Sequence, residues 1–542
     1  MVERQVRGDG ELQADAQREK DVLVDMADLG FWALAQADPD RLALVTPDGR
    51  EVTSGQLLVE TNQLTHGLIA LGLRPGDAIA VVLPNSQEFI ELYLAASQAG
   101  WYLVPINHHL VGPEIAHILS DSGARVFVTH SRFAQASMTA ADEVGFDKRM
   151  RFAVGDVPGF QPYAELKSGQ PSDLPEERTT GAVMNYTSGT TGQPKGVRRP
   201  LPGVAPEEIG PLLGGMLLMF KLLPLDDNVH IVGSPLYHTA VLVFGGGAMH
   251  LGHTVVLMDK WEPEGMLQLI ERHRVTSSHM VPTQFHRLLA LPDEVRSRYD
   301  VSSLRHMVHA AAPCPPDIKR QMIAWWGNVI DEYYAATEGG GTIVFAEEWM
   351  QKPGTVGQPW AISEVAIFDE AGDRLTEPHQ IGTVYMKMNS GRFEYYKDEE
   401  KTKKSRIGEY FTVGDVGELD EDGWLFLRDR KIDMIISGGA NIYPTEIENV
   451  LLTHPKVADV AVFGVPNEDW GEEVKAVVEP IDGVGGGAEL ETEILTWCEG
   501  RLARYKAPKS IDFVSELPRD PNGKLYKRKL RDPYWEDKAR AI

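Results

Sequence analysis

Apolar positions along most of this chain follow two alternating spacings, one typical of strands and one typical of helices. Short runs rich in β-branched residues have the composition of buried strands, and amphipathic segments such as 87–99 separate them. The strand-like runs stand at 77–83, 101–106, 125–129, 229–233, 254–258, 277–281 and 305–310. This alternation predicts an α/β fold of open, largely parallel sheets covered by helices, whose ligands bind at the carboxyl ends of the strands.

The pattern shortens after about residue 430. It predicts helices at 444–453 and 490–504, strands near 457–464 and 472–479, and a glycine-rich loop at 483–487. A chain of 542 residues also exceeds the size at which one hydrophobic core keeps growing. We therefore expect a large N-terminal α/β domain over residues 26–430, a small mobile α+β domain over residues 431–542, and a disordered N-terminus over residues 1–25.

Composition and charge exclude several classes of protein. The formal net charge of −26 opposes non-specific binding to nucleic acid or to anionic lipid. There is no run of about eighteen uncharged apolar residues and no apolar core of a secretory signal, so we expect a cytoplasmic protein without a transmembrane segment. The two cysteines, Cys314 and Cys498, do not suggest a disulfide framework or a zinc site, and we expect both to be small buried hydrophobes.

The segment from Tyr186 to Gly196, YTSGTTGQPKG, is the most informative motif. It combines Ser and Thr hydroxyls, glycines and Lys195 in a flexible loop that is dense in donors for phosphate oxygens. It is not a Walker A loop, which needs Gly before the lysine and Ser or Thr after it, because here Pro194 precedes Lys195 and Gly196 follows it. A loop of this composition is usually a surface turn, but the full string argues against that interpretation.

This loop resembles that of the adenylate-forming superfamily, which includes acyl-CoA synthetases, firefly luciferase and the adenylation domains of peptide synthetases. The resemblance extends over nearly the whole chain. In that family the loop closes over the β- and γ-phosphates of ATP. The resemblance therefore implies this role for Thr187, Ser188, Gly189, Thr190, Thr191, Gly192 and Lys195.

A second segment, DEYYAATEGGGT at 331–342, resembles the family's Tyr-Gly-x-Thr-Glu segment, with Ala335 in place of the usual glycine. The resemblance implies that Tyr334 stacks on adenine, that Thr337 contacts the α-phosphate and that Glu338 binds Mg²⁺. The chemistry agrees with these roles, because a carboxylate that attacks an anionic phosphate needs cations over the phosphate oxygens.

Two further matches concern the nucleotide. The segment VHAAAP at 308–313 implies that the backbone around Ala311 lies along the adenine, and ordinary strand-end core is the alternative for these alanines. Asp415 and Arg430 match the acidic and basic residues that family members use on the ribose hydroxyls. One carboxylate can accept hydrogen bonds from both hydroxyls of a vicinal diol.

The C-terminal region carries the matches that belong to the two half-reactions. Lys524 corresponds to the family lysine that bridges the carboxylate substrate and the α-phosphate during adenylation. In the second half-reaction the small domain of family members rotates, which implies that Gly438 and Gly439 line the tunnel for the pantetheine arm of coenzyme A. A plain turn is the alternative for these glycines. Where the family hinge commonly has Asp or Lys, this chain has Ile432, so we assign no hinge residue.

The acid site is predicted from SPLYHTA at 234–240, in which Tyr237 and His238 match residues that gate the acyl site and the thiol tunnel. Alone, His238 would be interpreted as a core histidine. The stretch from Val241 to Gly247 is apolar, lacks the acidic residue of amino-acid-activating relatives, and ends in three glycines that we interpret as space for a bulky acid. The expected walls of this pocket are Phe244, Thr283 and Phe285.

Together these observations predict an AMP-forming acyl-CoA synthetase for a fatty or bulky alicyclic or aromatic acid. It would use ATP, Mg²⁺ and coenzyme A, with Lys524, Glu338, Thr337 and His238 as its catalytic residues and a homodimer as one option for its assembly. Three rivals stay open: an acyl-AMP ligase that loads a carrier protein, a luciferase-like oxygenase, and a nucleotide-binding protein without catalysis. The first often carries an insertion that is not obvious here. The presence of Glu338, Lys195 and Lys524 together counts against the third, because binding alone does not require the lysine that serves the chemical step.

Overall fold

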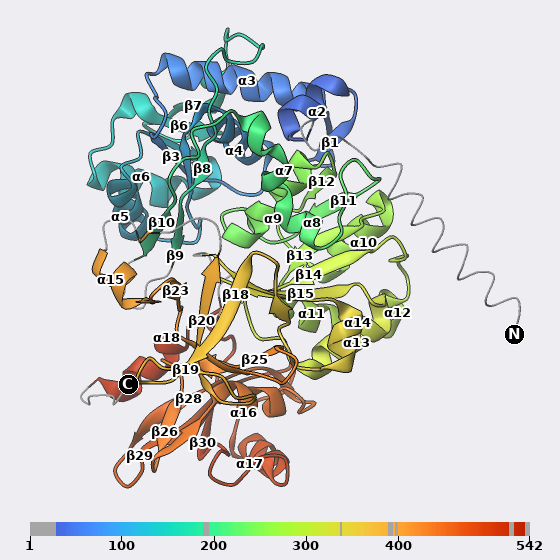
Figure 1. The fold of residues 1–542 in the computed structure, drawn as a ribbon, viewed down its shortest axis with the longest axis vertical. Coiled ribbons are helices and arrows are strands. Elements are labelled where there is room, and N and C mark those ends of the chain that lie inside the picture. Colours follow the sequence, from blue (N-terminus) through green and yellow to red (C-terminus); the bar gives the residue numbers. More distant parts are fainter. Residues whose placement is uncertain are drawn as a thin grey trace, which may run out of the picture. The chain divides into compact units, whose positions relative to one another are not determined.

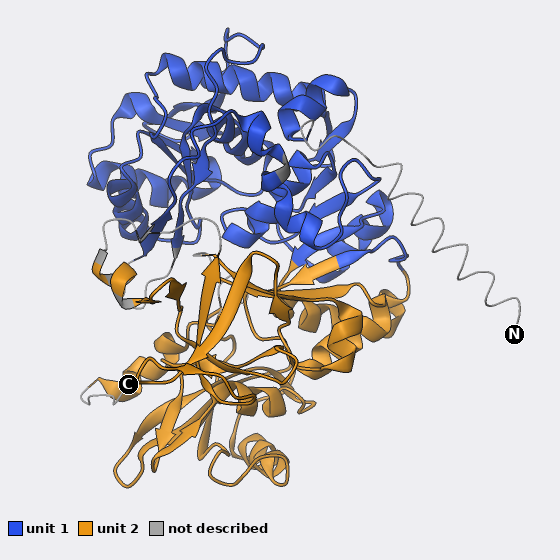
Figure 2. Ribbon diagram, in the orientation of Figure 1, with its two compact units in different colours: residues 1–279, 299–306, 394–397 blue, residues 280–298, 307–393, 398–542 orange. Residues whose placement is uncertain are grey.

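The computed structural model describes residues 29–187, 194–336, 339–388, 394–395, 399–519 and 525–536. The chain divides into two compact units, each built from stretches that are far apart in the sequence (Figure 2). Unit 1 comprises residues 1–279, 299–306 and 394–397, and unit 2 comprises residues 280–298, 307–393 and 398–542. The predicted disordered N-terminus, residues 1–25, lies outside the described residues. Within the described ranges, no helix is both long and apolar enough to cross a membrane.

The first sheet of unit 1 is parallel throughout, as the sequence predicts (Figure 1). Its strands lie in the order β7-β6-β5-β3-β4-β8. The central strands β3 and β4 are buried along their whole length, because a parallel sheet is covered on both faces. The strands are β3 (Ala78–Val82), β4 (Tyr102–Pro105), β5 (Val126–His130), β6 (Arg151–Val154), β7 (Gln161–Pro162) and β8 (Ala182–Val183), and the helices near them in sequence are α3 (Ser54–Ala70), α4 (Gln87–Ala99), α5 (Gly112–Ser122) and α6 (Ala134–Glu143).

Unit 1 contains a second, mixed set of strands in the order β13-β11-β12-β1-β2, of which only β2 runs antiparallel to its neighbour. A short antiparallel sheet, β21-β10-β9, completes the unit. The strands are β1 (Leu42–Val45), β2 (Glu51–Thr53), β9 (Asn185–Thr187), β10 (Lys195–Arg198), β11 (Val229–Val232), β12 (Thr254–Leu257), β13 (Ser277–Met280) and β21 (Glu394–Tyr395), and the helices are α2 (Phe31–Ala37), α7 (Gly210–Leu213), α8 (Gly215–Met219), α9 (Thr239–His250) and α10 (Pro263–His273).

Unit 2 begins with strands in the order β17-β16-β15-β14. β14 and β15 are parallel, and β16 and β17 are added antiparallel. The helix α13 connects β14 to β15, as the predicted alternation of strand and helix requires. The strands are β14 (His306–His309), β15 (Ile330–Ala335), β16 (Gly341–Val344) and β17 (Gln358–Pro359), and the helices are α11 (Pro282–Leu289), α12 (Asp293–Arg296), α13 (Pro316–Trp326) and α14 (Ala346–Gln351).

The sequence pattern does not anticipate the antiparallel sheet that residues 363–430 form. β20 shows why, because its buried positions alternate with partly exposed ones and several partner strands have only two residues, which leaves a weak periodicity. The strands are β18 (Ser363–Phe368), β19 (Arg374–Leu375), β20 (Gly382–Met388), β22 (Arg406–Ile407), β23 (Tyr410–Phe411), β24 (Asp415–Leu419) and β25 (Leu425–Arg430), with helix α15 (Glu399–Lys404).

Residues beyond 430 form a five-stranded sheet with one core cluster drawn from residues 435–513 and a second that adds Leu517 and the partly buried Leu525 and Leu530. The predicted elements appear, except that the helix predicted to reach residue 504 ends at Cys498, because Glu499 is extended and Gly500 has a φ of 74°. Cys498 is buried as predicted, whereas Cys314 is only partly buried. The elements are β26 (Ile435–Ser437), β27 (Ala440–Ile442), α16 (Pro444–Leu451), β28 (Val457–Asn467), β29 (Gly471–Pro480), α17 (Ala488–Cys498), β30 (Ser510–Phe513) and α18 (Lys527–Arg531). The domain boundary at residues 430 and 431 stays a prediction.

Four histidines are buried in unit 1 as neutral rings. His230, His250, His253 and His279 are each at most 3% exposed. Burial lowers the pKa of His230, His250 and His279 to about 3 and that of His253 to about 4. The contacts of His250 require the neutral ring, because its Nδ1 accepts a hydrogen bond from the Phe31 N–H at 3.2 Å.

We expect the free energy of unfolding to fall as the pH drops below 6.5, because the unfolded chain binds protons on these histidines that the folded chain excludes. Each folded pKa lies below the unfolded value, so the stabilisation is complete above pH 6.5 and is lost on acidification. For a folded pKa of about 3, the loss at pH 5 is about 2 kcal/mol per histidine. Thermal unfolding at pH 7.5 and at pH 5 measures this loss as a difference in Tm. The difference should be smaller in His230→Phe than in the wild type. An equal difference in variant and wild type would contradict the assignment.

Candidate active site

The three residues predicted for adenine and ribose lie together in unit 2. Tyr334 is the penultimate residue of β15, and Asp415 and Arg430 face each other as the first residue of β24 and the last residue of β25. The Tyr334 hydroxyl donates a hydrogen bond to Asp415 Oδ2 at 2.6 Å, and Arg430 Nε lies 3.3 Å from Asp415 Oδ1. We call this group the Asp415 network.

The electrostatics of the Asp415 network suit a nucleoside phosphate. The Asp415 side chain is 10% exposed, whereas the Arg430 side chain is 49% exposed. Burial alone would lower the pKa of Arg430, but the carboxylates of Asp415 and Asp433 outweigh it and raise the pKa, so the guanidinium stays charged. The network therefore offers a fixed carboxylate for hydroxyl donors, a ring held in place by its own hydroxyl, and a cation for an anionic group.

The turn that follows Tyr334 requires glycine. Gly339 and Gly340 have φ angles of 120° and 73°, which residues with a side chain rarely adopt. A Cβ at Gly341 would lie 2.2 Å from the carbonyl oxygen of Tyr334. The geometry of the turn between β15 and β16 therefore explains the run of three glycines that follows Glu338 in the sequence.

Ala311 follows β14 in a conformation that is rare for alanine. Its φ is 73°, in the left-handed region, where a Cβ costs about 1 to 2 kcal/mol. Ala310 is buried, whereas Ala311 is exposed, so Ala311 itself is not part of a strand-end core. Backbone strain of this kind concentrates at functional sites. Contact of Ala311 with adenine stays a prediction.

A buried ion pair that the sequence pattern does not reveal supports β15 behind Tyr334. Lys319 Nζ on α13 lies 2.6 Å from Glu332 Oε2 on β15, and the two side chains are 0% and 8% exposed. Burial raises the pKa of Glu332, although Lys319 opposes the shift. Removing one partner would leave a buried charge unpaired, so the pair fixes α13 to the strand that carries Tyr334. The signal available in the sequence is the pair of acidic residues inside the strand IDEYYA, of which Glu332 forms this ion pair.

In unit 1, β9 and β10 form the hairpin whose connection contains the phosphate motif. Thr187 is paired with Lys195, and Gly196 is paired with Tyr186. Helix α5 holds both ends, because the Tyr186 hydroxyl donates to Asp121 Oδ2 at 2.7 Å and His117 Nε2 donates to the Pro194 carbonyl at 3.1 Å. The motif therefore begins and ends on paired strands anchored to one helix.

Several predicted site residues belong to segments for which the structure gives no description. Those outside the described residues are Ser188, Gly189, Thr190, Thr191, Gly192, Thr337, Glu338 and Lys524. Their roles stay predictions.

The predicted gating residues belong to an aromatic cluster in unit 1, made of His108, Phe133, Tyr237 and His238. The ring centroids of Tyr237 and His238 are 4.3 Å apart, His108 meets Tyr237 edge-on at 5.0 Å, and Phe133 stacks on His108 at 4.5 Å. Burial and then the neighbouring His109 lower the pKa of His108 to about 4, so the His108 ring is neutral at pH 7. The sequence pattern pointed to Tyr237 and His238 but not to His108 or Phe133, which follow other strands.

The interpretation of the glycines in α9 as open space is wrong. A Cβ at Gly246 would lie 2.6 Å from the Tyr93 ring, one at Gly247 would lie 2.7 Å from Leu217, and one at Gly245 would lie 3.2 Å from Val232. These glycines let neighbouring elements pack closely against the helix.

The expected pocket walls also need correction. Phe244 is 1% exposed, with its ring 5.1 Å from that of His279, and Phe285 is 0% exposed, with its ring 5.3 Å from that of His309. Both are core residues, whereas Thr283 is partly exposed. The open face of α9 instead carries Thr239, Ala240 and Val243.

Gly438 and Gly439 form the two-residue turn between β26 and β27. Both have positive φ angles, 58° and 83°, which is the requirement of the tight hairpin turn that twists with its strands. A Cβ at Gly438 would lie 2.5 Å from the Trp470 ring, whereas no described atom lies within 4 Å of one at Gly439. Glycine is therefore required at position 438 by both its φ angle and its packing, and at position 439 by its φ angle alone.

The segment between β25 and β26 contains the predicted hinge. The Lys431 N–H donates to the Gly414 carbonyl at 2.8 Å, and the Asp433 N–H donates to the Arg430 carbonyl at 2.9 Å. Ile432 lies between them and is 37% exposed. The identity of the hinge residue stays open.

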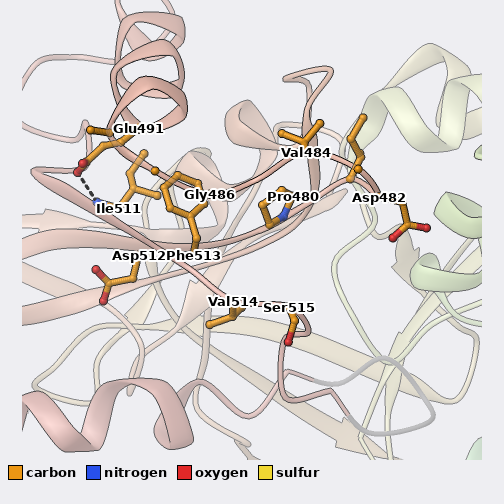
Figure 3. Close-up of a pocket in the computed structure, with 14 residues that line it drawn as sticks. Pro480, Asp482, Val484, Gly486, Glu491, Ile511, Asp512, Phe513, Val514 and Ser515 are labelled. Carbon is orange, nitrogen blue, oxygen red and sulfur yellow. Dashed lines mark hydrogen bonds between the residues drawn. The ribbon is translucent and has the colours of Figure 1, made fainter.

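A shallow groove of about 990 Å³ lies in the C-terminal sheet region, between the glycine-rich loop before α17 and the strand β30 (Figure 3). Two of its three carboxylates already have protein partners, because Glu491 accepts a hydrogen bond from the Ile511 N–H and Asp512 accepts one from Lys475 Nζ. None of the predicted site residues lines this groove.

Comparison with known proteins matches the AMP-binding enzyme family over residues 31–396 and the C-terminal domain of AMP-binding enzymes over residues 446–524. The long-chain-fatty-acid–CoA ligase FadD13 of Mycobacterium tuberculosis is 33% identical over 93% of this chain and 98% of that protein. The fatty acid–[acyl-carrier-protein] ligase ScoC of Streptomyces coeruleorubidus is 31% identical over 94% of this chain and 96% of that protein.

A solved structure gives the same result. The o-succinylbenzoate CoA synthetase MenE of Bacillus subtilis, in complex with its acyl-adenylate intermediate, matches with a TM-score of 0.77 at 27% identity over 93% of this chain and 97% of that chain. The predicted resemblance and the α/β fold are thus confirmed. The chain belongs to the AMP-binding enzyme family and is an adenylate-forming acid–thiol ligase.

Proposed function

We propose that the protein is an AMP-forming acyl-CoA synthetase. It joins a carboxylic acid to ATP, which releases pyrophosphate and leaves acyl-AMP, and then transfers the acyl group to the thiol of coenzyme A, which releases AMP. The observation that carries the proposal is the Asp415 network, because it holds a ring, a carboxylate and a cation together at the ends of three strands. AMP-forming ligases use ATP and coenzyme A, and this chain belongs to their family.

At the nucleoside end, Tyr334 stacks on adenine while Asp415 and Arg430 bind the ribose hydroxyls. The hydrogen bond from the Tyr334 hydroxyl to Asp415 supports this assignment, because it fixes the ring and the carboxylate relative to each other before the ligand binds. Ala311 lies along the other side of the adenine. Its small side chain and exposed, strained backbone suit close contact with a planar ring.

At the phosphate end, the loop between β9 and β10 binds the β- and γ-phosphates, and Thr337 contacts the α-phosphate. Glu338 would hold Mg²⁺, since a carboxylate oxygen is a ligand that Mg²⁺ prefers, and this ion binds through few protein ligands when substrate phosphates supply the others. Bound Mg²⁺ supplies positive charge over the phosphate oxygens. The loop residues are Thr187, Ser188, Gly189, Thr190, Thr191, Gly192 and Lys195.

The two half-reactions use different residues of the C-terminal region. Lys524 bridges the substrate carboxylate and the α-phosphate, which reduces the repulsion between two anions as they meet. Gly438 and Gly439 line the path of the pantetheine arm after the small domain turns. His238 stands at the acyl site, where the aromatic cluster supports it through contact with Tyr237.

The acid substrate has a large apolar body, as in a fatty acid or a bulky alicyclic or aromatic acid. The support is now the open face of α9, whose Thr239, Ala240 and Val243 carry no charge, rather than the glycines on the packed side. Relatives are named for a long-chain fatty acid and for o-succinylbenzoate, both of which have such a body. A cytoplasmic location and a homodimer stay predictions.

A carrier-protein ligase is the second candidate. It is favoured by the 31% identity to ScoC, which is named for an acyl carrier protein and matches over 94% of this chain. The choice between coenzyme A and a carrier protein concerns only the thiol acceptor, so both candidates share the adenylation step.

The first test of this function is the adenylation step. We expect the protein to exchange labelled pyrophosphate into ATP only when Mg²⁺ and a suitable acid are present, and to consume coenzyme A while releasing AMP. In a panel of acids, those with large apolar bodies should have a higher kcat/KM than acetate, because each methylene that is buried on binding contributes roughly 0.8 kcal/mol of transfer free energy. Exchange without any acid, or a preference for acetate or a free amino acid, would contradict the proposal. Thioester formation on a carrier protein but not on coenzyme A would favour the second candidate.

A second test concerns the Asp415 network. Asp415→Asn should weaken ATP binding by about ten- to a hundred-fold, because a charge-assisted acceptor for both Arg430 and the ribose is lost. Glu418→Gln is a matched control, since Glu418 is a buried carboxylate on the same strand and accepts from Arg428 Nη2 at 2.7 Å, away from Tyr334. Titration calorimetry with ATP and Mg²⁺ measures both variants. Equal losses of affinity in the two variants would remove the assigned role of Asp415.

A third test separates the half-reactions. Lys524→Ala should slow adenylation by about a hundred-fold or more yet still convert supplied acyl-AMP and coenzyme A to thioester. Gly439→Leu should do the reverse, because its side chain obstructs the thiol path. Gly439→Asn is the control, since asparagine tolerates the φ of 83° and isolates the effect of backbone strain. If Lys524→Ala and Gly439→Leu impaired both steps alike while melting normally, the assignment of these residues to separate steps would fail.

A further inference from the structure

We propose that Asn85 is a positioning residue that holds Tyr237 and His238 in place for the acyl and thiol steps. This inference rests on the proposed function, in which these two residues stand at the acyl site. Asn85 lies just after β3 and is far in sequence from the segment it holds, which runs from Ser234 to His238 between β11 and α9.

The Asn85 side-chain amide acts both as a hydrogen-bond donor and as an acceptor. Its Nδ2 donates to the carbonyl oxygens of Ser234 and Met258, each at 3.0 Å, and its Oδ1 accepts from the Leu236 N–H at 2.8 Å. Asn85 is 4% exposed, so water cannot readily replace these partners. Both amide hydrogens and the amide oxygen are used, which makes asparagine specific for this position, because a carboxylate there would face two carbonyl oxygens.

Asn85 binds the backbone directly before the side chains of Tyr237 and His238. Ser234 and Leu236, whose backbones Asn85 binds, are each 1% exposed, and Tyr237 follows Leu236 directly. The His238 N–H then closes a turn on the Pro235 carbonyl at 3.1 Å before α9 begins. A shift of the tethered backbone would therefore move the rings of Tyr237 and His238.

The same loop after β3 also supports the aromatic cluster from a second side. His108 Nδ1 donates to the Leu83 carbonyl at 3.3 Å, and the His108 ring meets Tyr237 edge-on. Met258, the other carbonyl partner of Asn85, directly follows β12. Asn85 thus joins the carboxyl end of β3, in the first sheet of unit 1, to the carboxyl ends of β11 and β12, in the second, and ligands of such sheets bind at the carboxyl ends of their strands.

The test compares Asn85→Ala with Asn62→Ala in the full-length protein. Asn62 is a matched control, because it is 1% exposed, lies in the same unit on α3, and uses its amide to donate to the Ser172 carbonyl at 2.9 Å and to accept from Gln98 at 3.2 Å. Asn85→Ser, whose hydroxyl can keep one of the three bonds, provides a milder change in case Asn85→Ala does not fold.

The kinetic readout is the pattern of changes across substrates. In Asn85→Ala we expect the KM for the acid to rise about ten-fold and thioester formation from supplied acyl-AMP to slow by about ten-fold, as for one lost buried amide, while the KM for ATP changes less than about two-fold. ATP is spared because the Asp415 network lies on other strands. Asn62→Ala should lower Tm by a comparable amount and leave this pattern as in the wild type.

A second readout does not depend on activity. Hydrogen–deuterium exchange of the peptide covering residues 233–239 should become faster in Asn85→Ala, because the Leu236 amide loses its acceptor, and should be unchanged in Asn62→Ala. Unchanged exchange in Asn85→Ala would overturn the tether. Faster exchange together with equal changes in the KM values for acid and ATP would overturn the positioning role. If the wild type shows no acid-dependent exchange of pyrophosphate into ATP, the proposed function fails and the positioning role fails with it. Hydrogen–deuterium exchange of the peptide still decides whether Asn85 holds the backbone of Leu236.

Discussion

Parallel strands end at the same edge of their sheet, and the candidate active site depends on this constraint. Loops that follow β3, β11 and β12 are far apart in sequence, yet one buried amide, that of Asn85, reaches the backbones of the other two. Gathering three loops in this way would be costly without such a partner, because buried carbonyl and amide groups that lose water need hydrogen bonds within the protein. β3 belongs to one sheet of unit 1 and β11 and β12 belong to another, and Asn85 fixes the relative positions of their loops. Tyr237 and His238 therefore stand on a rigid support although they belong to a connecting segment.

Local charge, rather than net charge, prepares the protein for an anionic ligand. The chain carries a formal charge of −26, which would repel ATP at long range. Within unit 2, however, Arg430 stays charged beside Asp415, and its side chain remains half exposed. The buried ion pair of Lys319 and Glu332 has a different role, because its two charges pair with each other and are not available to a ligand. The exposed cation can meet a ligand, whereas the buried cation can only hold the strand.

Glycine serves two physical purposes in this fold, and the difference changes the interpretation of the substrate. Gly340 and Gly439 stand where the backbone has a positive φ, so they shape turns next to predicted site residues. Gly246 in α9 instead lies against the Tyr93 ring, where any Cβ would collide. A glycine-rich sequence thus does not by itself indicate an empty pocket. Support for a large apolar acid comes instead from the uncharged open face of α9 near Val243.

The sequence by itself determined the elements and the chemistry that depend on local order. Strand runs such as 77–83 and 229–233 are recognisable because a strand covered on both faces must be continuously apolar, and the phosphate motif is recognisable because donors for phosphate must be dense within one loop. The antiparallel sheet of residues 363–430 escaped this reasoning, since its short strands have weak periodicity. Only the tertiary structure decided that Asn85 binds the loop of Tyr237, and that the space beside Gly246 is filled. Long-range contacts of this kind are set by how separate elements pack, and packing depends on the shapes of partners that no local pattern records.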